Sequence, residues 1–306
     1  MVDVVMATYN GAPYIGEQLD SILNQTYKDI RIYIRDDGSN DGTLEVIKER
    51  QNRYPEKIVL IVDSVKCGSS RSNFMQAVKS TTAEYVMFSD QDDYWLPNKI
   101  QHTLDKMAEI ENRVGIEKPI LVFGSYKPVD ENLKEKKDNP SNRQEAAYKL
   151  KFSNLLVQNY VQGCLMMLNR ALVNCMGDYD DAILMHDWWA ALIAAGGGTI
   201  EHLDEIMMLY RQHGDNVVGC VDVKSYKYRL SKLFNSKTKN SNKAVLEQAK
   251  LLRHRCLDVM STDNRKRLDD FIGLYEKGKM GRVLSLIKGG YLKSDIVRIL
   301  GQIWYA

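Results

Sequence analysis

Three carboxylates stand within four residues at Asp90, Asp92 and Asp93, directly after an apolar segment. Carboxylates this close repel one another strongly unless a cation lies among them. Oxygen ligands suit the hard ions Mg²⁺ or Mn²⁺, and Mg²⁺ commonly uses one or two protein carboxylates plus substrate phosphates. The alternative is that these residues cap the helix that begins near Pro97, but capping needs one aspartate and not three. We therefore expect a divalent metal at this run.

The elements that position this run follow an alternating pattern. Apolar β-branched segments alternate with segments of helical periodicity through the first 125 residues, which is typical of βα units around a parallel sheet. The predicted strands are Val2–Ala7, Ile30–Arg35, Ile58–Val62, Tyr85–Ser89 and Ile120–Phe123. The predicted helices are Tyr14–Leu23, Gly42–Tyr54, Ser72–Lys79 and one that starts near Pro97.

Polar loops follow the first four of these strands. In open parallel sheets, ligands bind outside the carboxyl ends of the strands, so we expect these loops to converge on one crevice. They are Thr8–Gly11, Asp36–Asp41, Gly68–Asn73 and Ser89–Asp93. The segment Asp36–Ser39 also fits an ordinary turn, but its place beside Thr8 and Asn10 favours hydrogen bonding to a nucleoside. No G-x-G-x-x-G or G-x-x-x-x-G-K-[ST] pattern occurs, so a carboxylate-held metal must carry the phosphate charge.

Later segments are less regular. A polar, charge-dense stretch over Asp130–Arg143 predicts an exposed loop. After it we expect a strand at Cys164–Leu168, a helix at Trp188–Ala195, and two short strands at Thr199–Leu203 and Ile206–Tyr210.

Charge divides the 306 residues into two parts. The formal net charge is only +2, which gives no reason to expect a nucleic-acid partner. Residues 1–224 contain 24 Lys+Arg and 33 Asp+Glu, a net −9, whereas residues 225–306 contain 18 and 7, a net +11. A basic tail on an acidic body suggests different partners for the two parts.

Cysteines and apolar segments indicate the compartment. The five cysteines have no zinc spacing and are odd in number, which favours a reducing environment. The start of the chain is typical of a strand and not of a signal peptide. The longest uncharged, mostly apolar segment, Trp188–Ile200, has 13 residues, short of the roughly 18 to 20 that span a bilayer. We expect a cytoplasmic protein, at most peripheral on the inner face of the membrane.

Five motifs in order resemble the family 2 inverting glycosyltransferases of the GT-A fold, in particular the bacterial rhamnosyltransferase-like branch that builds cell-surface polysaccharides. The motifs are Ala7–Gly11, Arg35–Ser39, Asp90–Pro97, His186–Trp189 and Tyr210–Asn216. The resemblance covers residues 1–220. It implies an α/β fold with a mainly parallel twisted sheet flanked by helices. The catalytic domain would be 1–222, with nucleotide-sugar binding over about 1–125, the acceptor side over about 150–222, and a basic helical region over 223–306.

The resemblance also implies roles for single residues. On the donor side, the nucleoside would be contacted by Thr8, Asn10 and Asp37. Arg71 or Asn73 would lie near the nucleotide. Asp90 would face the ribose or the donor sugar. Asp92, with Asp93, would hold the metal, and which aspartate ligates it stays open. His213 would close the metal or diphosphate site, although a solitary histidine is also a common polar residue. Arg211 has the side chain that suits phosphate.

Sugar transfer from a nucleoside diphosphate sugar needs a base for the acceptor hydroxyl and a cation for the departing diphosphate. Asp187 is the candidate base in a single displacement with inversion, and the alternative is a stabilising first-turn acid. Trp188 and Trp189 would form an acceptor wall, with at least one of them in the core, because adjacent helix residues point about 100° apart. Trp95 fits either the core or an acceptor lid.

Alternatives remain for partner and function. The basic tail fits an anionic membrane surface beside a lipid-linked or glycan acceptor, and equally a helical subdomain or a homodimer contact. By resemblance the donor is dTDP-rhamnose first and a UDP-sugar second. A sugar nucleotidyltransferase also uses a parallel sheet and a carboxylate-bound metal, and an inactive glycan-binding protein would bind without turnover.

Overall fold

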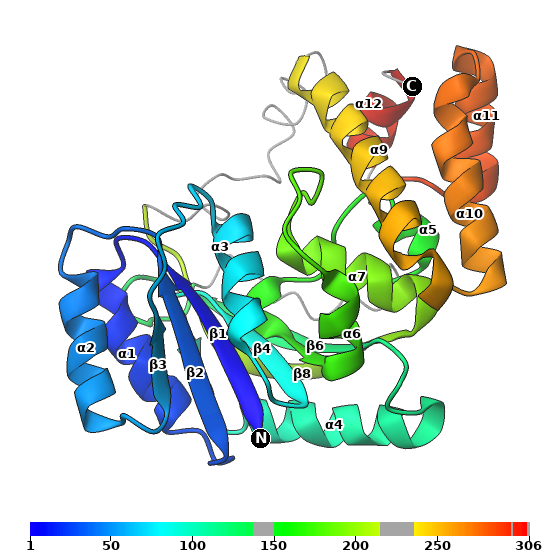
Figure 1. The fold of residues 1–306 in the computed structure, drawn as a ribbon. Helices are drawn as coiled ribbons and strands as arrows, with labels where there is room; N and C mark the ends of the chain where they lie inside the picture. Colours follow the sequence, from blue (N-terminus) through cyan, green and yellow to red (C-terminus); the bar gives the residue numbers. More distant parts are fainter. Residues whose placement is uncertain (137–149, 215–235, 295, 305–306) are drawn as a thin grey trace.

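Eight strands form one twisted sheet in the computed structural model, which describes residues 1–136, 150–214, 236–294 and 296–304 (Figure 1). The order across the sheet is β3-β2-β1-β4-β7-β6-β8-β5. The strands are β1 Val2–Thr8, β2 Ile30–Asp36, β3 Ile58–Ile61, β4 Tyr85–Ser89, β5 Tyr94–Trp95, β6 Ile120–Val129, β7 Met166–Asn169 and β8 Thr199–Arg211. Pairings β1–β2, β1–β4, β2–β3 and β6–β8 are parallel, whereas β4–β7, β6–β7 and β5–β8 are antiparallel. The predicted mainly parallel α/β fold is confirmed.

The first four strands build the edge at which ligands are expected. The chain runs outward from β1 to β2 and β3, then crosses back to β4 on the other side of β1. Such a reversal of strand order opens a crevice at the carboxyl ends of the strands. The connecting helices are α1 Ala12–Leu23, α2 Thr43–Arg53 and α3 Ser70–Ala77. The first four predicted strands end within one residue of those observed.

The second half of the catalytic part differs from the sequence prediction in two places. The strand expected from Cys164 begins at Met166, because Gly163–Leu165 form a 3-10 turn, η2. The two short strands expected from Thr199 to Tyr210 are one strand, β8. His202 pairs with Phe123 of β6 and Met208 pairs with Tyr126, so β8 advances six residues where β6 advances three. The extra residues of β8 form a bulge, and its polar side chains are the reason why the sequence predicts two strands.

The remaining helices either pack beside the sheet or form the C-terminal part of the molecule. They are α4 Lys99–Val114, α5 Phe152–Leu155, α6 Arg170–Met176, α7 His186–Gly197, α9 Ser236–Cys256, α10 Thr262–Ile272, α11 Lys279–Gly289 and α12 Ile296–Trp304. Short 3-10 turns are η1 Val78–Ser80, η3 Leu257–Val259 and η4 Gly273–Glu276. Helices α9 to α12 gather at the end of the molecule opposite α1 and α2 (Figure 1).

The C-terminal helices continue the hydrophobic core of the molecule and are fixed to α7. Leu252, Leu268 and Phe271 are at most 1% exposed. Asn264 donates through Nδ2 to the carbonyls of Ala195 (3.1 Å) and Gly196 (3.0 Å), which belong to the last turn of α7. This contact satisfies carbonyls that a helix end leaves without internal partners.

Several expectations fall partly outside the described residues. The domain boundary predicted at residue 222 lies there, as does most of the loop expected over Asp130–Arg143. Its described beginning is a turn in which the Asp130 carboxylate accepts from the backbone N–H groups of Asn132 and Lys134, both at 2.9 Å. The four cysteines within the described ranges are free thiols. Among the helices that the structure describes, none is long and apolar enough to cross a bilayer.

Candidate active site

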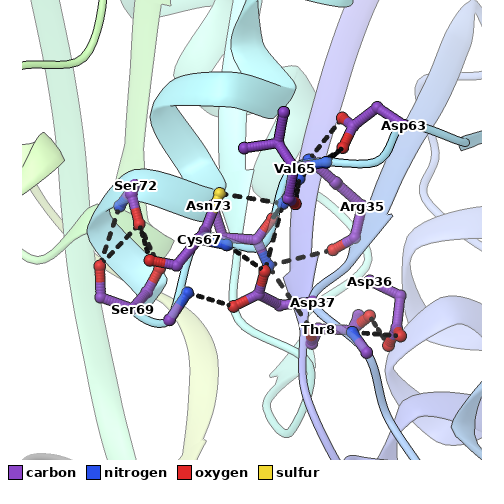
Figure 2. Close-up of polar contacts among 12 residues, drawn as sticks. Thr8, Arg35, Asp36, Asp37, Asp63, Val65, Cys67, Ser69, Ser72 and Asn73 are labelled. Atoms are coloured by element: carbon purple, nitrogen blue, oxygen red, sulfur yellow. Dashed lines mark hydrogen bonds and ion pairs between the residues drawn. The ribbon is translucent and has the colours of Figure 1, made fainter.

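The carboxyl ends of β1 and β2 are joined by the Asp36 carboxylate. It accepts a hydrogen bond from Thr8 Oγ1 at 2.8 Å (Figure 2). It also accepts from Ser39 Oγ at 2.5 Å and from the backbone N–H groups of Gly38 and Ser39. Asn10 adopts a positive φ of 50°, and its side-chain oxygen accepts from the Asn40 N–H at 3.0 Å. The loop that follows Asp36 is therefore a hydrogen-bonded turn, and it contacts both Thr8 and Asn10.

Asp37 and Asn73 belong to a second polar network one strand further. The Asp37 carboxylate accepts from the backbone N–H groups of Cys67 and Gly68, each at 2.7 Å (Figure 2). The buried Arg35 guanidinium bonds to the Asn73 side-chain oxygen at 2.8 Å and to the Asp63 carboxylate. Asn73 is 2% exposed. The buried Asn73 thus holds the Arg35 guanidinium in place by a hydrogen bond, whereas Asp37 is more exposed than Asn73.

Arg71 points away from this network. Its Nη1 donates to the Ile183 carbonyl at 3.2 Å, and its guanidinium lies 6.0 Å from the centre of the Tyr179 ring. The side chain therefore links α3 to the segment that leads into α7.

The acidic run is tied directly to the β1 loop. The side-chain amide of Gln91 accepts from the Tyr9 N–H at 2.9 Å and donates to the Tyr9 carbonyl at 3.0 Å. The expected nucleoside residues and the expected metal residues consequently border one region at the carboxyl end of the sheet.

Asp90, which is partly exposed, forms the inner part of the acidic cluster with the buried Asp93 and Cys164. One ligand atom from each of the three residues lies within 4.8 Å of the others. Asp93 is 0% exposed, and its Oδ2 has no hydrogen-bond partner, while Oδ1 accepts from the Arg211 N–H at 3.3 Å. Burial raises the pKa of both carboxyl groups, and the charge of Asp92 raises each pKa further.

Lys99 supplies positive charge near these two aspartates. The side chain is 1% exposed, and Nζ donates to the Cys164 carbonyl at 2.5 Å and lies 3.6 Å from the centre of the Trp95 ring. Burial lowers the pKa of Lys99 to about 7, although Cys164, Asp93 and Asp90 act to raise it. The ammonium in turn lowers the pKa of both aspartates.

Asp92 and His213 form the more accessible part of the acidic cluster. Asp92 Oδ2 and His213 Nε2 are 2.8 Å apart, and the His213 ring stacks on Tyr14 with centres 4.6 Å apart. Arg211 is 2% exposed; its Nε donates to the Asp92 carbonyl at 2.8 Å and its Nη2 pairs with Glu17. Arg211 therefore fixes the backbone of the acidic run.

The donor set fits a hard divalent cation. Asp93 Oδ2 is a buried carboxylate oxygen without a partner, and such an atom favours either a proton or a cation. Burial raises the pKa of the Cys164 thiol well above its usual range, so this sulfur stays protonated and is a poor ligand. The carboxylate oxygens of Asp90 and Asp93 remain in this group as donors suited to Mg²⁺ or Mn²⁺, and Asp92 and His213 form a separate pair next to them in the acidic run.

Asp187 lies in the first turn of α7 and is 8% exposed. Its carboxylate accepts from the Trp188 N–H at 2.6 Å and from the Gly163 N–H at 3.1 Å. Burial outweighs these hydrogen bonds and raises the pKa of Asp187 to about 6. The charge of Asp187 also raises the pKa of Asp90, so the two acidic positions share one electrostatic environment. A carboxylate of this pKa can accept a proton near neutral pH.

His186 is packed and not exposed to a ligand. Its ring contacts Phe74 and Phe88, with centres 4.2 and 5.0 Å apart, and neither ring nitrogen has a hydrogen-bond partner. Burial lowers the pKa of His186 to about 3, so the ring is neutral.

The three candidate acceptor tryptophans differ in their exposure to solvent. Trp189 is 0% exposed and donates to the Met176 carbonyl at 2.8 Å, and Trp95 is 1% exposed beneath Lys99. Both belong to the hydrophobic core. This agrees with the expectation that at least one of Trp188 and Trp189 is a core residue, decides for Trp95 between core and acceptor lid, and removes both Trp189 and Trp95 from the acceptor contacts. Trp188 is half-buried, with its indole N–H on the Leu155 carbonyl at 2.6 Å, and it alone of the three reaches the surface.

Lys99 and Gln91 were not singled out from the sequence. A signal for Lys99 existed, because it shares a helical stripe with the buried Thr103, Met107 and Ile110 of α4. A lysine on such a stripe must be paired or functional. Gln91 carried no such signal, since its two bonds join residues 82 positions apart.

The family model described as glycosyl transferase family 2 matches residues 3–175, more than half of the chain. The chain belongs to this family. It is 32% identical over 226 residues to the dTDP-rhamnosyl transferase RfbG of Shigella flexneri, covering 70% of this chain and 73% of that protein. It is 27% identical over 218 residues to the uncharacterized glycosyltransferase RT0329 of Rickettsia typhi, covering 70% and 64%.

Solved glycosyltransferases share the GT-A fold with this chain. S. aureus TarS in complex with UDP-GlcNAc superposes with a TM-score of 0.59 at 17% identity, over 94% of this chain and 80% of that one. The mannosyltransferase PcManGT from Pyrobaculum calidifontis, in complex with GDP-Man and Mn²⁺, gives 0.55 at 15% identity, over 97% and 76%. At such identities the likeness concerns the fold.

Proposed function

We propose that this glycosyltransferase transfers a deoxyhexose, rhamnose first, from a nucleoside diphosphate sugar to an acceptor hydroxyl with inversion at the anomeric carbon. The observation that carries the proposal is the pairing of two acidic positions in one environment: Asp187, whose pKa is raised to about 6, raises the pKa of Asp90. A base on one side of a reacting carbon and a leaving-group site on the other permit a single displacement without a covalent intermediate.

In this mechanism the ionised Asp187 takes the acceptor proton as the new glycosidic bond forms. Asp92 and His213, with Asp93 behind them, would hold Mg²⁺ or Mn²⁺, which supplies Lewis-acid stabilisation to the departing diphosphate. Asp90 faces the ribose or donor sugar. A metal in this role agrees with the hard oxygen donors present and with the Mn²⁺ in the complex of PcManGT.

The nucleoside would lie over the ends of β1 and β2. Thr8, Asn10 and Asp37 would form its contacts. In this proposal Asn73 and Arg211 do not contact the donor and instead support the residues that do. Asn73 accepts a hydrogen bond from Arg35, and Arg211 donates one to the Asp92 carbonyl. Arg71 would serve the acceptor side through its bond to Ile183. The rhamnose assignment is supported by the name of RfbG, a dTDP-rhamnosyl transferase, and UDP-sugars are the second candidates.

The acceptor would be a growing cell-surface polysaccharide or a lipid-linked oligosaccharide, with Trp188 on its binding surface. We place the enzyme in the cytoplasm at the inner face of the membrane, where such an acceptor is built. A homodimer through the C-terminal helices is the alternative use of that region.

The experiment is incubation of the full chain with dTDP-rhamnose or UDP-hexoses and Mn²⁺. Release of the nucleoside diphosphate, with an inverted anomeric configuration in the product by NMR, supports the proposal. Release of pyrophosphate would identify a nucleotidyltransferase instead. Donor binding without any release would identify an inactive binding protein.

A further inference from the structure

Exposed large apolar side chains are concentrated on two adjacent helices. Of the twelve such residues in the described part of the chain, six lie on α11 and α12. They are Met280, Leu284 and Ile287 on α11, and Ile296, Leu300 and Trp304 on α12, each between 53% and 77% exposed. We call these six residues the hairpin face. The other six are distributed among distant loops and strand ends, which is normal for a protein surface.

The spacing puts each set of three on one stripe of its helix. Positions i, i+4 and i+7 on α11, and i, i+4 and i+8 on α12, share a face. The opposite faces carry Leu286 and Gln302, which are 6% and 5% exposed and pack inward. Both helices are therefore amphipathic, and each already buries its other side.

A contact between two residues joins the start of α11 to the end of α12. Lys279, at the start of α11, donates through Nζ to the carbonyl of Trp304 at 3.1 Å, and Nζ lies 5.4 Å from the centre of that indole ring. The start of α11 thus lies beside the end of α12.

Basic residues accompany the hairpin face. Residues 279–304 contain five Lys+Arg and one Asp, a net +4. Lys279, Lys288 and Arg298 are exposed. A second copy of the chain would bring the same positive charge against this surface, which opposes association through it. An anionic surface has the complementary charge, and tryptophan is favoured at the boundary between water and lipid.

We propose that the hairpin face docks on an anionic lipid surface, with its apolar side chains inserted at the level of the headgroups and its basic residues against lipid phosphates. The biological meaning of this membrane contact rests on the proposed function. If the acceptor is lipid-linked, the contact determines which side of the enzyme faces the membrane that holds the acceptor.

The test is co-sedimentation of the full chain with vesicles of phosphatidylcholine alone or mixed with phosphatidylglycerol, without donor or metal. The wild type should bind the mixed vesicles about tenfold or more tightly than the neutral ones, and about 0.5 M NaCl should release much of it. The double variant Leu284→Gln/Leu300→Gln should lose about tenfold or more in binding. Lys288→Gln/Arg298→Gln should remove the preference for phosphatidylglycerol.

The matched control is Ile116→Gln. Ile116 is 65% exposed and follows α4 in the chain. Helix α4 runs along the bottom of the view in Figure 1, whereas α11 and α12 lie at the top. The Ile116→Gln variant should bind like the wild type, and circular dichroism should show all variants folded. Equal binding by the Leu284→Gln/Leu300→Gln variant and the wild type would overturn the proposal. A wild-type dimer that this variant converts to a monomer, without vesicle binding, would assign the face to a second copy. Because donor and metal are absent, failure of transferase activity would leave this result intact.

Discussion

Oδ2 of Asp187 accepts a hydrogen bond from the backbone N–H of Gly163 at 3.1 Å. The next residue, Cys164, accepts through its carbonyl from Lys99 Nζ at 2.5 Å. A single 3-10 turn therefore positions both the candidate base and the lysine beneath the acidic cluster. Glycine is required in this turn, since a Cβ at Gly163 would lie 2.5 Å from Nε2 of His186. The backbone of this turn therefore helps to fix the positions of both Asp187 and Lys99.

Asp187→Asn should reduce turnover about a thousandfold, because the amide cannot accept the acceptor proton. Donor affinity, measured by titration with dTDP or UDP and Mn²⁺, should change little. The control Asp181→Asn alters an exposed aspartate in the segment before α7 and should leave turnover unchanged. Near-wild-type turnover in Asp187→Asn would remove Asp187 from the role of base.

Turnover should rise with pH through about 6. Burial raises the pKa of Asp187 to about 6, and the base works only in its ionised form. Below that value the carboxylate becomes protonated, so the rate should fall about tenfold for each further pH unit. Initial rates at saturating donor, with circular dichroism to show that the fold persists, would measure this limb. A rate that is flat between about pH 5 and 7 contradicts the assignment.

The first half of the fold could be predicted because its signals are local. The β1, β2, β3 and β4 strands end within one residue of their predicted positions, since each is an apolar run bounded by turn residues. The β8 strand was divided in two because Asp204 and Glu205 are polar, and only pairing with β6 shows that they lie in a bulge. Bulges depend on the partner strand and leave little trace in one sequence.

The candidate site was predictable by residue type and much less by orientation. Three aspartates in four residues indicate a cation site, but which oxygens are buried depends on contacts far along the chain, such as that between Asp93 and Arg211. Trp189 and Trp188 could not be told apart as core and surface until the axial rotation of α7 was known. The role of Lys99 depends on the carbonyl of Cys164, 65 positions away.

Asp92→Asn and His213→Gln should each weaken donor binding about tenfold or more in the presence of Mn²⁺, and much less in its absence. The reason is that Asp92 Oδ2 and His213 Nε2, 2.8 Å apart, would hold the ion together. Isothermal titration with UDP or dTDP, with and without EDTA, measures the difference. Asp105→Asn, an exposed aspartate on α4, is the control. Equal losses with and without the ion would show a structural role in place of a metal-binding one.

Lys99→Met should lower the free energy of unfolding by about 3 kcal/mol, because it leaves the buried Asp93 and its neighbour Asp90 without the positive charge of Lys99. Urea denaturation at neutral pH measures this change. Lys48→Met, at an exposed position of α2, should change stability by less than about 0.5 kcal/mol. If Lys99→Met is as stable as the wild type, the carboxyl pair must be neutral in the folded protein and does not need the ammonium.

Gly197→Ala should destabilise the junction between α7 and the C-terminal helices. A Cβ at Gly197 would lie 2.0 Å from the carbonyl oxygen of Val259 and 2.6 Å from its carbonyl carbon, and backbone atoms cannot yield as a flexible side chain can. Forcing the two segments apart should cost about 2 kcal/mol in urea denaturation. The control is Gly273→Ala, since a Cβ there meets nothing within 4 Å and the backbone φ is −67°. Equal stability of the two variants would mean that the C-terminal helices do not pack on α7 in solution.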